Sequence, residues 1–168
     1  MIGWVIFTRS IASNSRSNQQ SGKVEHVSSD LKISLEYPKG WYVDDRDMNL
    51  LLTNYPSSLN KDLKPAGNQL ELFISNFSGC HSTIEEDLRD PGCGEGGPTV
   101  KPSEIISKDA RETQGGTFYK YVLKSPNNQF TYYLLQKGDR VLQISKSPDP
   151  SQYEKEFDQI INSIRFLK

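Results

Sequence analysis

The sequence has little of the material from which metal centres and nucleophilic active sites are usually built. Its 168 residues include two cysteines, Cys80 and Cys93, and two histidines, His26 and His81. A structural zinc site needs four ligands in short-spaced pairs, and a cysteine nucleophile needs an imidazole that faces it, usually from another element. Cys80 and His81 are sequence neighbours, so neither arrangement is favoured. We therefore expect a protein that is not an enzyme, with a small metal-dependent enzyme or hydrolase as the weak alternative.

An excess of charge and a long hydrophobic run are also missing. Twenty basic and 21 acidic residues give a formal net charge of -1. This balance does not create the basic field that binds nucleic acid or an acidic membrane surface. The apolar stretch at residues 1–7 is far too short to cross a bilayer. We expect no nucleic-acid partner and no integral membrane span in this chain.

Two acidic runs and one glycine-rich run do not have the spacing of ligand-binding loops. Residues 44–47 and 85–87 lack the alternating oxygen ligands and central glycine of a calcium loop. Residues 92–98 lack the lysine and hydroxyl residue that end a phosphate-binding loop. The patterns predict a solvated loop, a helix N-terminus and a surface loop, respectively, and they indicate no cofactor.

The two cysteines leave three interpretations open. In an exported chain, Cys80 and Cys93 would close a disulfide loop of about 14 residues, which stabilises by roughly 3 kcal/mol in the chain-entropy model. In a reducing compartment they would remain two thiols, and ligation of a metal is the third possibility. Turn-forming residues surround both cysteines. This favours the Cys80–Cys93 disulfide.

The first 23 residues are expected to lie outside the folded domain. Residues 1–7 are apolar and are followed by a small-x-small pattern at residues 10–12, as in the remnant of a signal peptide or membrane anchor. Residues 13–23 are nearly all polar or glycine, which is typical of a flexible tether. The sequence thus predicts a stub and tether over 1–23 and a single domain over 24–168.

Alternation of apolar and polar residues predicts a mainly antiparallel sheet. Ile33, Leu35 and Tyr37 alternate with Ser34 and Glu36, which indicates a strand with one wet face. Glycines at 115–116 and at 138 mark two hairpin turns. Strands are predicted at 31–37, 48–54, 69–77, 104–112, 118–124, 129–136 and 140–145.

Two helices are predicted beside these strands. Residues 83–88 are short and acidic, with Ser82 or Thr83 as the cap. Residues 151–164 place one broad apolar stripe at helical spacing. The stripe consists of Tyr153, Phe157, Ile160, Ile161 and Ile164. We expect an α+β fold, an α-β-α sandwich with a central antiparallel sheet of about six to seven strands and the C-terminal helix packed on it.

Aromatic side chains are the remaining candidates for a recognition surface. Each strand sends roughly half of its side chains inward, so packing in the core claims most of them. The candidates for a binding face are Trp41, Tyr42, Tyr55, Tyr119, Tyr121, Tyr132 and Tyr133.

Two segments carry a resemblance to a known family. The strand that ends in Tyr37-Pro38-Lys39-Gly40-Trp41 and the closing helix at residues 157–166 resemble the PsbP-like domain family. That family is named after an extrinsic protein of the photosystem II oxygen-evolving complex and includes small exported bacterial proteins. The resemblance covers about residues 24–168 and implies an α-β-α sandwich. It implies calcium only by analogy, because no ligand residue can be carried over to this chain.

We therefore expect an exported or membrane-tethered accessory domain that binds a protein complex at a membrane surface. Its compartment would be extracytoplasmic: secreted, in the cell envelope, or in the thylakoid lumen. An accessory subunit of the photosystem II oxygen-evolving complex is the alternative that the resemblance implies. A fold analogy alone transfers little function.

Overall fold

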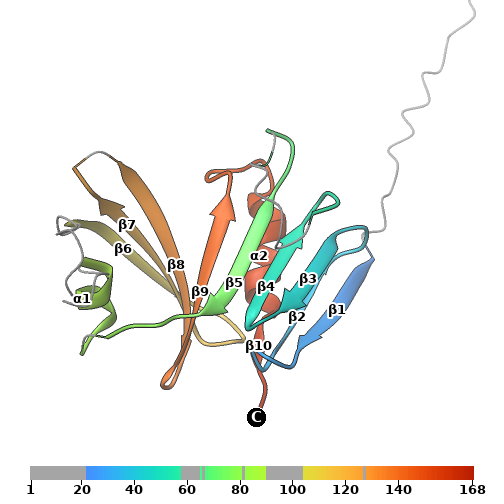
Figure 1. The fold of residues 1–168 in the computed structure, drawn as a ribbon, viewed down its shortest axis with the longest axis horizontal. Helices are drawn as coiled ribbons and strands as arrows, with labels where there is room; N and C mark the ends of the chain where they lie inside the picture. Colours follow the sequence, from blue (N-terminus) through green and yellow to red (C-terminus); the bar gives the residue numbers. More distant parts are fainter. Residues whose placement is uncertain (1–21, 58–64, 66, 81, 90–103, 127) are drawn as a thin grey trace, which may run out of the picture.

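The computed structural model describes residues 22–57, 65, 67–80, 82–89, 104–126 and 128–168. Its main element is a seven-stranded antiparallel sheet in the order β3-β4-β5-β9-β8-β7-β6 (Figure 1). The strands are β3 (Tyr42–Arg46), β4 (Asn49–Thr53), β5 (Glu71–Asn76), β6 (Glu104–Glu112), β7 (Thr117–Lys124), β8 (Gln129–Lys137) and β9 (Arg140–Ser147). The α+β class and the seven-stranded antiparallel sheet agree with the sequence prediction.

A second, three-stranded sheet joins the two ends of the described chain. It has the order β1-β2-β10, with β1 (Lys23–Ser28), β2 (Ile33–Pro38) and β10 (Arg165–Phe166). Both outer strands pair antiparallel with β2. The predicted strand at 31–37 is confirmed as β2, but its partner β1 was not predicted. The C-terminal segment is thus held against the first hairpin of the domain.

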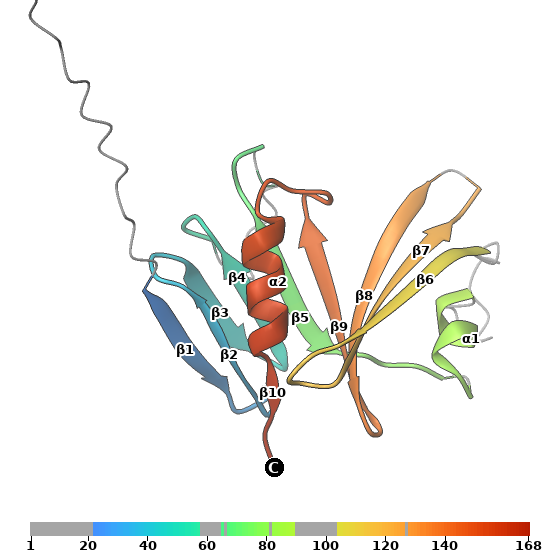
Figure 2. The same cartoon turned by 180° about the vertical axis from the view of Figure 1, so that it is seen from behind.

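Two helices cover opposite faces of the main sheet. Side chains alternate along β7, so Phe118 joins the larger core with α2 (Glu154–Ser163), whereas Tyr121 and Leu123 join a second cluster with Leu88 of α1 (Ile84–Arg89). Figure 2 shows α2 on one side of the main sheet and close to β10. This arrangement agrees with the predicted sandwich, and the predicted stripe of α2 supplies buried Phe157, Ile160 and Ile161.

Side-chain hydrogen bonds lie at the start of both helices, and those of α1 form a reciprocal cap. For α1, Glu86 N–H donates to Thr83 Oγ1 and Thr83 N–H donates to Glu86 Oε2, each at 3.2 Å. Before α2, Ser151 N–H donates to Glu154 Oε1 at 2.8 Å. The predicted helix began at residue 151, but α2 begins at Glu154, and Tyr153 is the residue at its N-cap.

The acidic run at 44–47 is not the solvated loop that the sequence predicted. Residues 44–46 belong to strand β3, which pairs with β4. The turn between these strands is formed by Asp47 and Met48, with φ of 54° and 59°. A two-residue turn with two positive φ angles usually contains glycine. Because this turn contains no glycine, the hairpin of β3 and β4 was not predicted from the sequence.

The turn between β6 and β7 gives a test of close packing. Gly116 has a φ of 138°, and a Cβ atom there would lie 2.2 Å from the backbone oxygen of Gln136. We expect Gly116→Ala to lower the free energy of unfolding by about 2–3 kcal/mol, because strain and a backbone clash add. Gly138→Ala is the matched control: its φ is 64° with open space around it, so it suffers the strain alone. Equal losses for both variants in urea unfolding would contradict the packing at Gly116.

Candidate functional site

A cleft of about 280 Å³ lies between α2 and the outer strands of the main sheet. One wall comes from β6, β7 and β8, and the other comes from α2. The cleft is lined by Asp109, Ala110, Arg111, Phe118, Lys120, Tyr133, Glu154, Phe157 and Asp158. A concave surface that combines apolar and charged groups is where a ligand or partner would be expected to bind.

Strand register places the residues of the sheet wall side by side. Asp109 of β6 lies opposite Lys120 of β7, which in turn lies opposite Tyr133 of β8. Arg111, two residues after Asp109 on β6, lies opposite Phe118, which is two residues before Lys120 on β7. Residues two apart on a strand share a face, so the two rows present their side chains to one surface.

The floor of the cleft is aromatic. Phe118 and Tyr133 stack with ring centroids 5.8 Å apart and an angle of 14° between their planes. Phe157 of α2 lies 6.2 Å from Phe118 and 5.1 Å from Tyr133, both measured between ring centroids. Both distances are in the range of favourable ring contacts. The three rings are only 3–5% exposed, so they join α2 to the sheet as part of the larger core that underlies the cleft.

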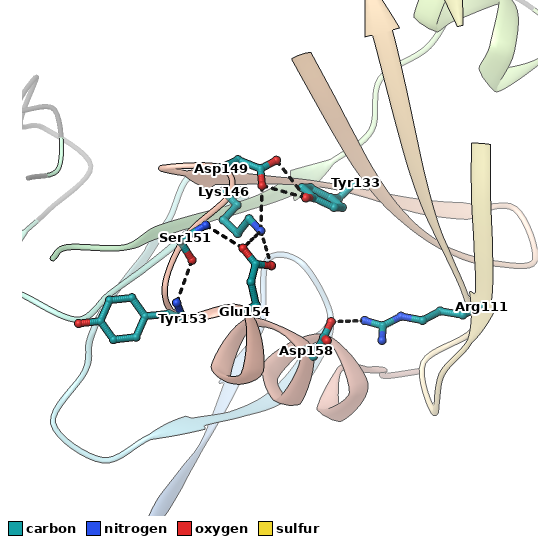
Figure 3. A network of polar contacts seen from close by, with 8 residues as sticks. All are labelled: Arg111, Tyr133, Lys146, Asp149, Ser151, Tyr153, Glu154 and Asp158. Carbon is teal, nitrogen blue, oxygen red and sulfur yellow. Dashed lines mark hydrogen bonds and ion pairs between the residues drawn. The ribbon is translucent and has the colours of Figure 1, made fainter. Parts of the chain in front are cut away.

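A buried lysine organises the end of the cleft near the start of α2. The side chain of Lys146 is only 1% exposed, and its Nζ lies 2.9 Å from Asp149 Oδ1 and 2.7 Å from Glu154 Oε2 (Figure 3). The same ammonium lies 4.6 Å from the centroid of the Phe157 ring. Two carboxylates and an aromatic face therefore compensate for the lost hydration of this charge.

Tyr133 connects the aromatic floor to this polar network. Its hydroxyl donates to Asp149 at 2.9 Å from Oδ2. Burial raises the pKa of Tyr133 well above its usual range, and the hydrogen bond to Asp149 raises it further. The hydroxyl is therefore a neutral donor at physiological pH.

Glu154 is held ionised by the same network. Burial alone would raise its pKa, but hydrogen bonds from Lys146 and from the Ser151 N–H outweigh that effect and lower the pKa. A general acid or base works best with a pKa near the operating pH. Tyr133 and Glu154 are both moved away from neutrality, so their environment suits a fixed binding surface better than proton transfer.

Acid is expected to weaken the Lys146–Glu154 contact. Because the folded-state pKa of Glu154 lies below the usual 4.5, its contribution is complete above about pH 4.5 and is lost as the pH falls through the lowered pKa. The side chain is 50% exposed, so solvent screening keeps the effect modest. Urea unfolding of the native protein and Glu154→Gln should differ most at neutral pH and converge in acid. A difference that stays constant with pH would contradict this assignment.

One ion pair bridges the cleft from the sheet to the helix. Arg111 Nη2 donates to Asp158 Oδ1 at 2.6 Å, and Figure 3 shows the side chain reaching from β6 towards α2. The guanidinium carbon also lies 4.9 Å from the centroid of the Phe118 ring. The two side chains are 40% and 50% exposed, so this bridge can rearrange when something binds.

Two other polar clusters lie away from the cleft. Lys108 Nζ and the Tyr121 hydroxyl both donate to Glu85 Oε1, at 2.6 and 2.9 Å, and the bond from Lys108 lowers the pKa of Glu85. This cluster attaches α1 to β6 and β7.

The other cluster contains the residue types of a hydrolytic triad in a different order. Asp45 lies in the middle, with His26 Nε2 at 2.8 Å from Oδ2 and Ser28 Oγ donating to Oδ1 at 3.0 Å. A catalytic serine must instead contact the imidazole. Ser28 is completely buried and also accepts a hydrogen bond from Leu31 N–H. The cluster therefore serves to join β1 to β3, at the edges of the two sheets.

The predicted cysteine site is described only in part. Cys80 is exposed, and its N–H donates to Asp87 Oδ1 at 2.7 Å. Cys93 and His81 lie outside the described residues, as do the glycine-rich run at 92–98 and residues 1–21. The Cys80–Cys93 disulfide and the tether stay predictions.

Within the described ranges, no group of three or more His, Cys, Asp or Glu residues is placed to hold a metal ion. The helices in those ranges include none that is long and apolar enough to cross a membrane.

Of the aromatic candidates, only Tyr133 lines the cleft. The charged lining residues were not singled out from the sequence. Their spacing carries no motif, because Arg111 and Asp158 meet only through the packing of α2 on the sheet. The nearest local signal was the Ser-x-x-Glu spacing at 151–154, where the Ser151 N–H donates to the Glu154 carboxylate and helps to position it.

Comparisons with known proteins concern the fold. No protein-family model and no curated protein matches the sequence. A crystal structure from Bacteroides thetaiotaomicron VPI-5482 is 18% identical, with a TM-score of 0.42, over 88% of this chain and 49% of that chain. The solution structure of cyanobacterial PsbP (CyanoP) from Synechocystis sp. PCC 6803 is 12% identical, with a TM-score of 0.44, over 89% of this chain and 95% of that one. The chain thus spans about half the length of the Bacteroides protein.

Proposed function

We propose that this protein is a non-enzymatic binding domain of PsbP-like type, and that the cleft between α2 and β6–β8 is its binding face. The domain would be exported or membrane-tethered and would act as an accessory module of a protein complex at a membrane surface. The family resemblance of residues 37–41 and 157–166 supports the type of domain. The cleft supports the binding role.

The observation that carries the proposal is the fixed state of the groups in the cleft. Glu154 is ionised and paired with Lys146, Tyr133 is neutral and bonded to Asp149, and the stacked rings of Phe118 and Tyr133 pack in the core beneath the cleft. Such groups are already oriented, so a partner does not have to order them when it binds. A surface of this kind favours recognition over chemical turnover.

Site-specific photo-crosslinking in the native host tests the binding face. A photoreactive amino acid replaces Lys120 in the cleft or, as the matched control, Lys155, an exposed residue of α2 that does not line it. We expect one discrete protein adduct from position 120, reduced strongly by Arg111→Glu, and none from position 155. The absence of an adduct at position 120, or equal adducts from both positions, would refute the cleft as the binding face.

The proposed compartment has an independent test. The intact mass of protein taken from its native host, after thiol blocking without reductant, reports on Cys80 and Cys93. An unlabelled mass, lighter by the two thiol hydrogens, would support the disulfide and an oxidising compartment. Two labelled thiols would argue against export.

A further inference from the structure

Strand β6 forms one edge of the main sheet, and within the described ranges no further strand pairs with its outer side (Figure 2). All residues from Ser107 to Glu112 are exposed. An edge strand presents a row of unpaired backbone N–H and C=O groups, which can pair with another strand. With nine residues, β6 is long enough for such pairing, whereas β3 at the other end of the sheet has five residues.

The turn between β6 and β7 fixes which backbone groups of β6 point outwards. Thr113 N–H donates to the Gly116 carbonyl at 2.9 Å, and Gly116 N–H donates back to the Thr113 carbonyl at 3.4 Å. Pairs that exchange hydrogen bonds alternate along an antiparallel ladder with pairs that do not. The register runs without a shift from this turn back to the β-bulge of β6. Lys108, Ala110 and Glu112 therefore direct their N–H and C=O groups away from β7.

This outer edge is bounded on both sides. A β-bulge interrupts the pairing between Ile105 and Ser107, and the turn begins at Thr113. Both features bend the backbone and end regular pairing. The regular stretch thus covers residues 107–113, and Ala110 is its midpoint. A second copy of the same stretch can pair with it antiparallel, about a two-fold axis at Ala110.

The charged side chains of this stretch decide its register. Charges usually discourage pairing at a sheet edge. Because the outward groups recur at every second residue, the allowed registers are centred on successive residues of the stretch. A register centred on any of the charged residues 108, 109, 111 or 112 sets that residue opposite itself, so like charges meet. The register centred on Ala110 instead sets Asp109 opposite Arg111 and Lys108 opposite Glu112.

The backbone supplies the association in such a pairing, and the charges select its register. Lys108 and Arg111 are already bonded to Glu85 and Asp158. An acidic residue across the interface therefore adds little affinity to either of them. A like-charged residue in the same place would be a cost that the backbone hydrogen bonds have to offset.

We propose that β6 pairs antiparallel with β6 of a second copy of this chain, about a two-fold axis at Ala110. Lys108 then exchanges two backbone hydrogen bonds with Glu112 of the second copy, and the two Ala110 residues do the same. Residues opposite each other share a face, so the two main sheets join into one, with both α2 helices on the same side. This inference goes beyond the proposed function and does not depend on it.

Sedimentation velocity of the full chain tests the association. Two paired edge strands form a small interface, so we expect a reversible dimer whose fraction rises between about 10 µM and 1 mM of protein. A chain that sediments as a monomer over this whole range overturns the proposal. That result would leave the binding role of the cleft untouched.

An exchange of charges between two variants tests the register. Asp109→Arg sets like charges opposite each other at both contacts with Arg111, and Arg111→Asp does so at both contacts with Asp109. Each variant alone should associate at least about tenfold more weakly than the native protein. An equimolar mixture sets opposite charges together again and should associate within about threefold of the native protein. Lys155→Glu, at an exposed position of α2, is the control and should associate as the native protein does.

A proline tests the backbone hydrogen bonds. The N–H of Ala110 points away from β7, so Ala110→Pro removes a bond of the proposed dimer and none of the β6–β7 ladder. We expect a folded monomer. Ala110→Ser keeps the N–H and is the matched control, which should form the dimer as the native protein does.

Each variant result bears on one part of the proposal. A dimer that persists in Ala110→Pro would place the interface elsewhere and overturn the pairing of β6. A mixture of the two charge variants that stays monomeric would overturn the register centred on Ala110. Circular dichroism shows which variants are folded. If Ala110→Pro does not fold, the charge exchange decides alone, because mixing changes only the partner that each variant meets.

Discussion

Ile161→Asp is expected to unfold the domain. Ile161 is 0% exposed and lies in the larger core, on the stripe of α2 that packs against the sheet. An aspartate there would have to bury its charge without a partner, or take up a proton. The loss should be about 4 kcal/mol or more, which is comparable with the whole stability of many domains of this size.

Neighbouring substitutions show whether burial is the cause. Asn162 is the next residue in α2 and is exposed, so Asn162→Asp should stay within about 0.5 kcal/mol of the native protein. Ile161→Val removes one methylene and should cost about 1 kcal/mol. Circular dichroism and urea unfolding would rank the three variants. A folded, soluble Ile161→Asp protein of near-native stability would refute the packing of α2 on the sheet.

Lys146→Ala is expected to have the second largest effect, a loss of about 3 kcal/mol. The substitution leaves Asp149 and Glu154 close together without their shared cation, and it empties the space over the Tyr133 and Phe157 rings. Removing one partner of a buried ion pair typically costs about 3–5 kcal/mol. The lower end applies here because the two acidic side chains are 22% and 50% exposed and can regain hydration.

A volume-conserving variant separates charge from packing at this site. Lys146→Met keeps the long apolar stem against the rings but removes the ammonium, so it should cost less than Lys146→Ala. Lys155→Ala, on the exposed side of α2, should be neutral within about 0.5 kcal/mol. Thermal unfolding at neutral pH would measure all three. Lys146→Ala with native stability would mean that the network contributes nothing to the fold.

The sequence predicted best where the local signal and the tertiary structure agree. The strand at 104–112 has the predicted bounds, and the glycines at 115–116 mark the turn that follows it. Helix α2 was predicted because its apolar stripe repeats at helical spacing and matches the face that is buried. The prediction failed for β3, whose turn at 47–48 has positive φ without glycine, and for β1, which is stabilised by its partner β2.

The sequence by itself determined the α+β class, most strands, both helices and the buried face of α2, because these follow from periodicities within a few neighbouring residues. Only the tertiary structure decided the cleft. Its groups come from positions 109 to 158, and strand register together with the packing of α2 brings them within a few ångströms. The ionised state of Glu154 and the neutral state of Tyr133 also depend on Lys146 and Asp149, because desolvation and hydrogen bonding act through space rather than along the chain.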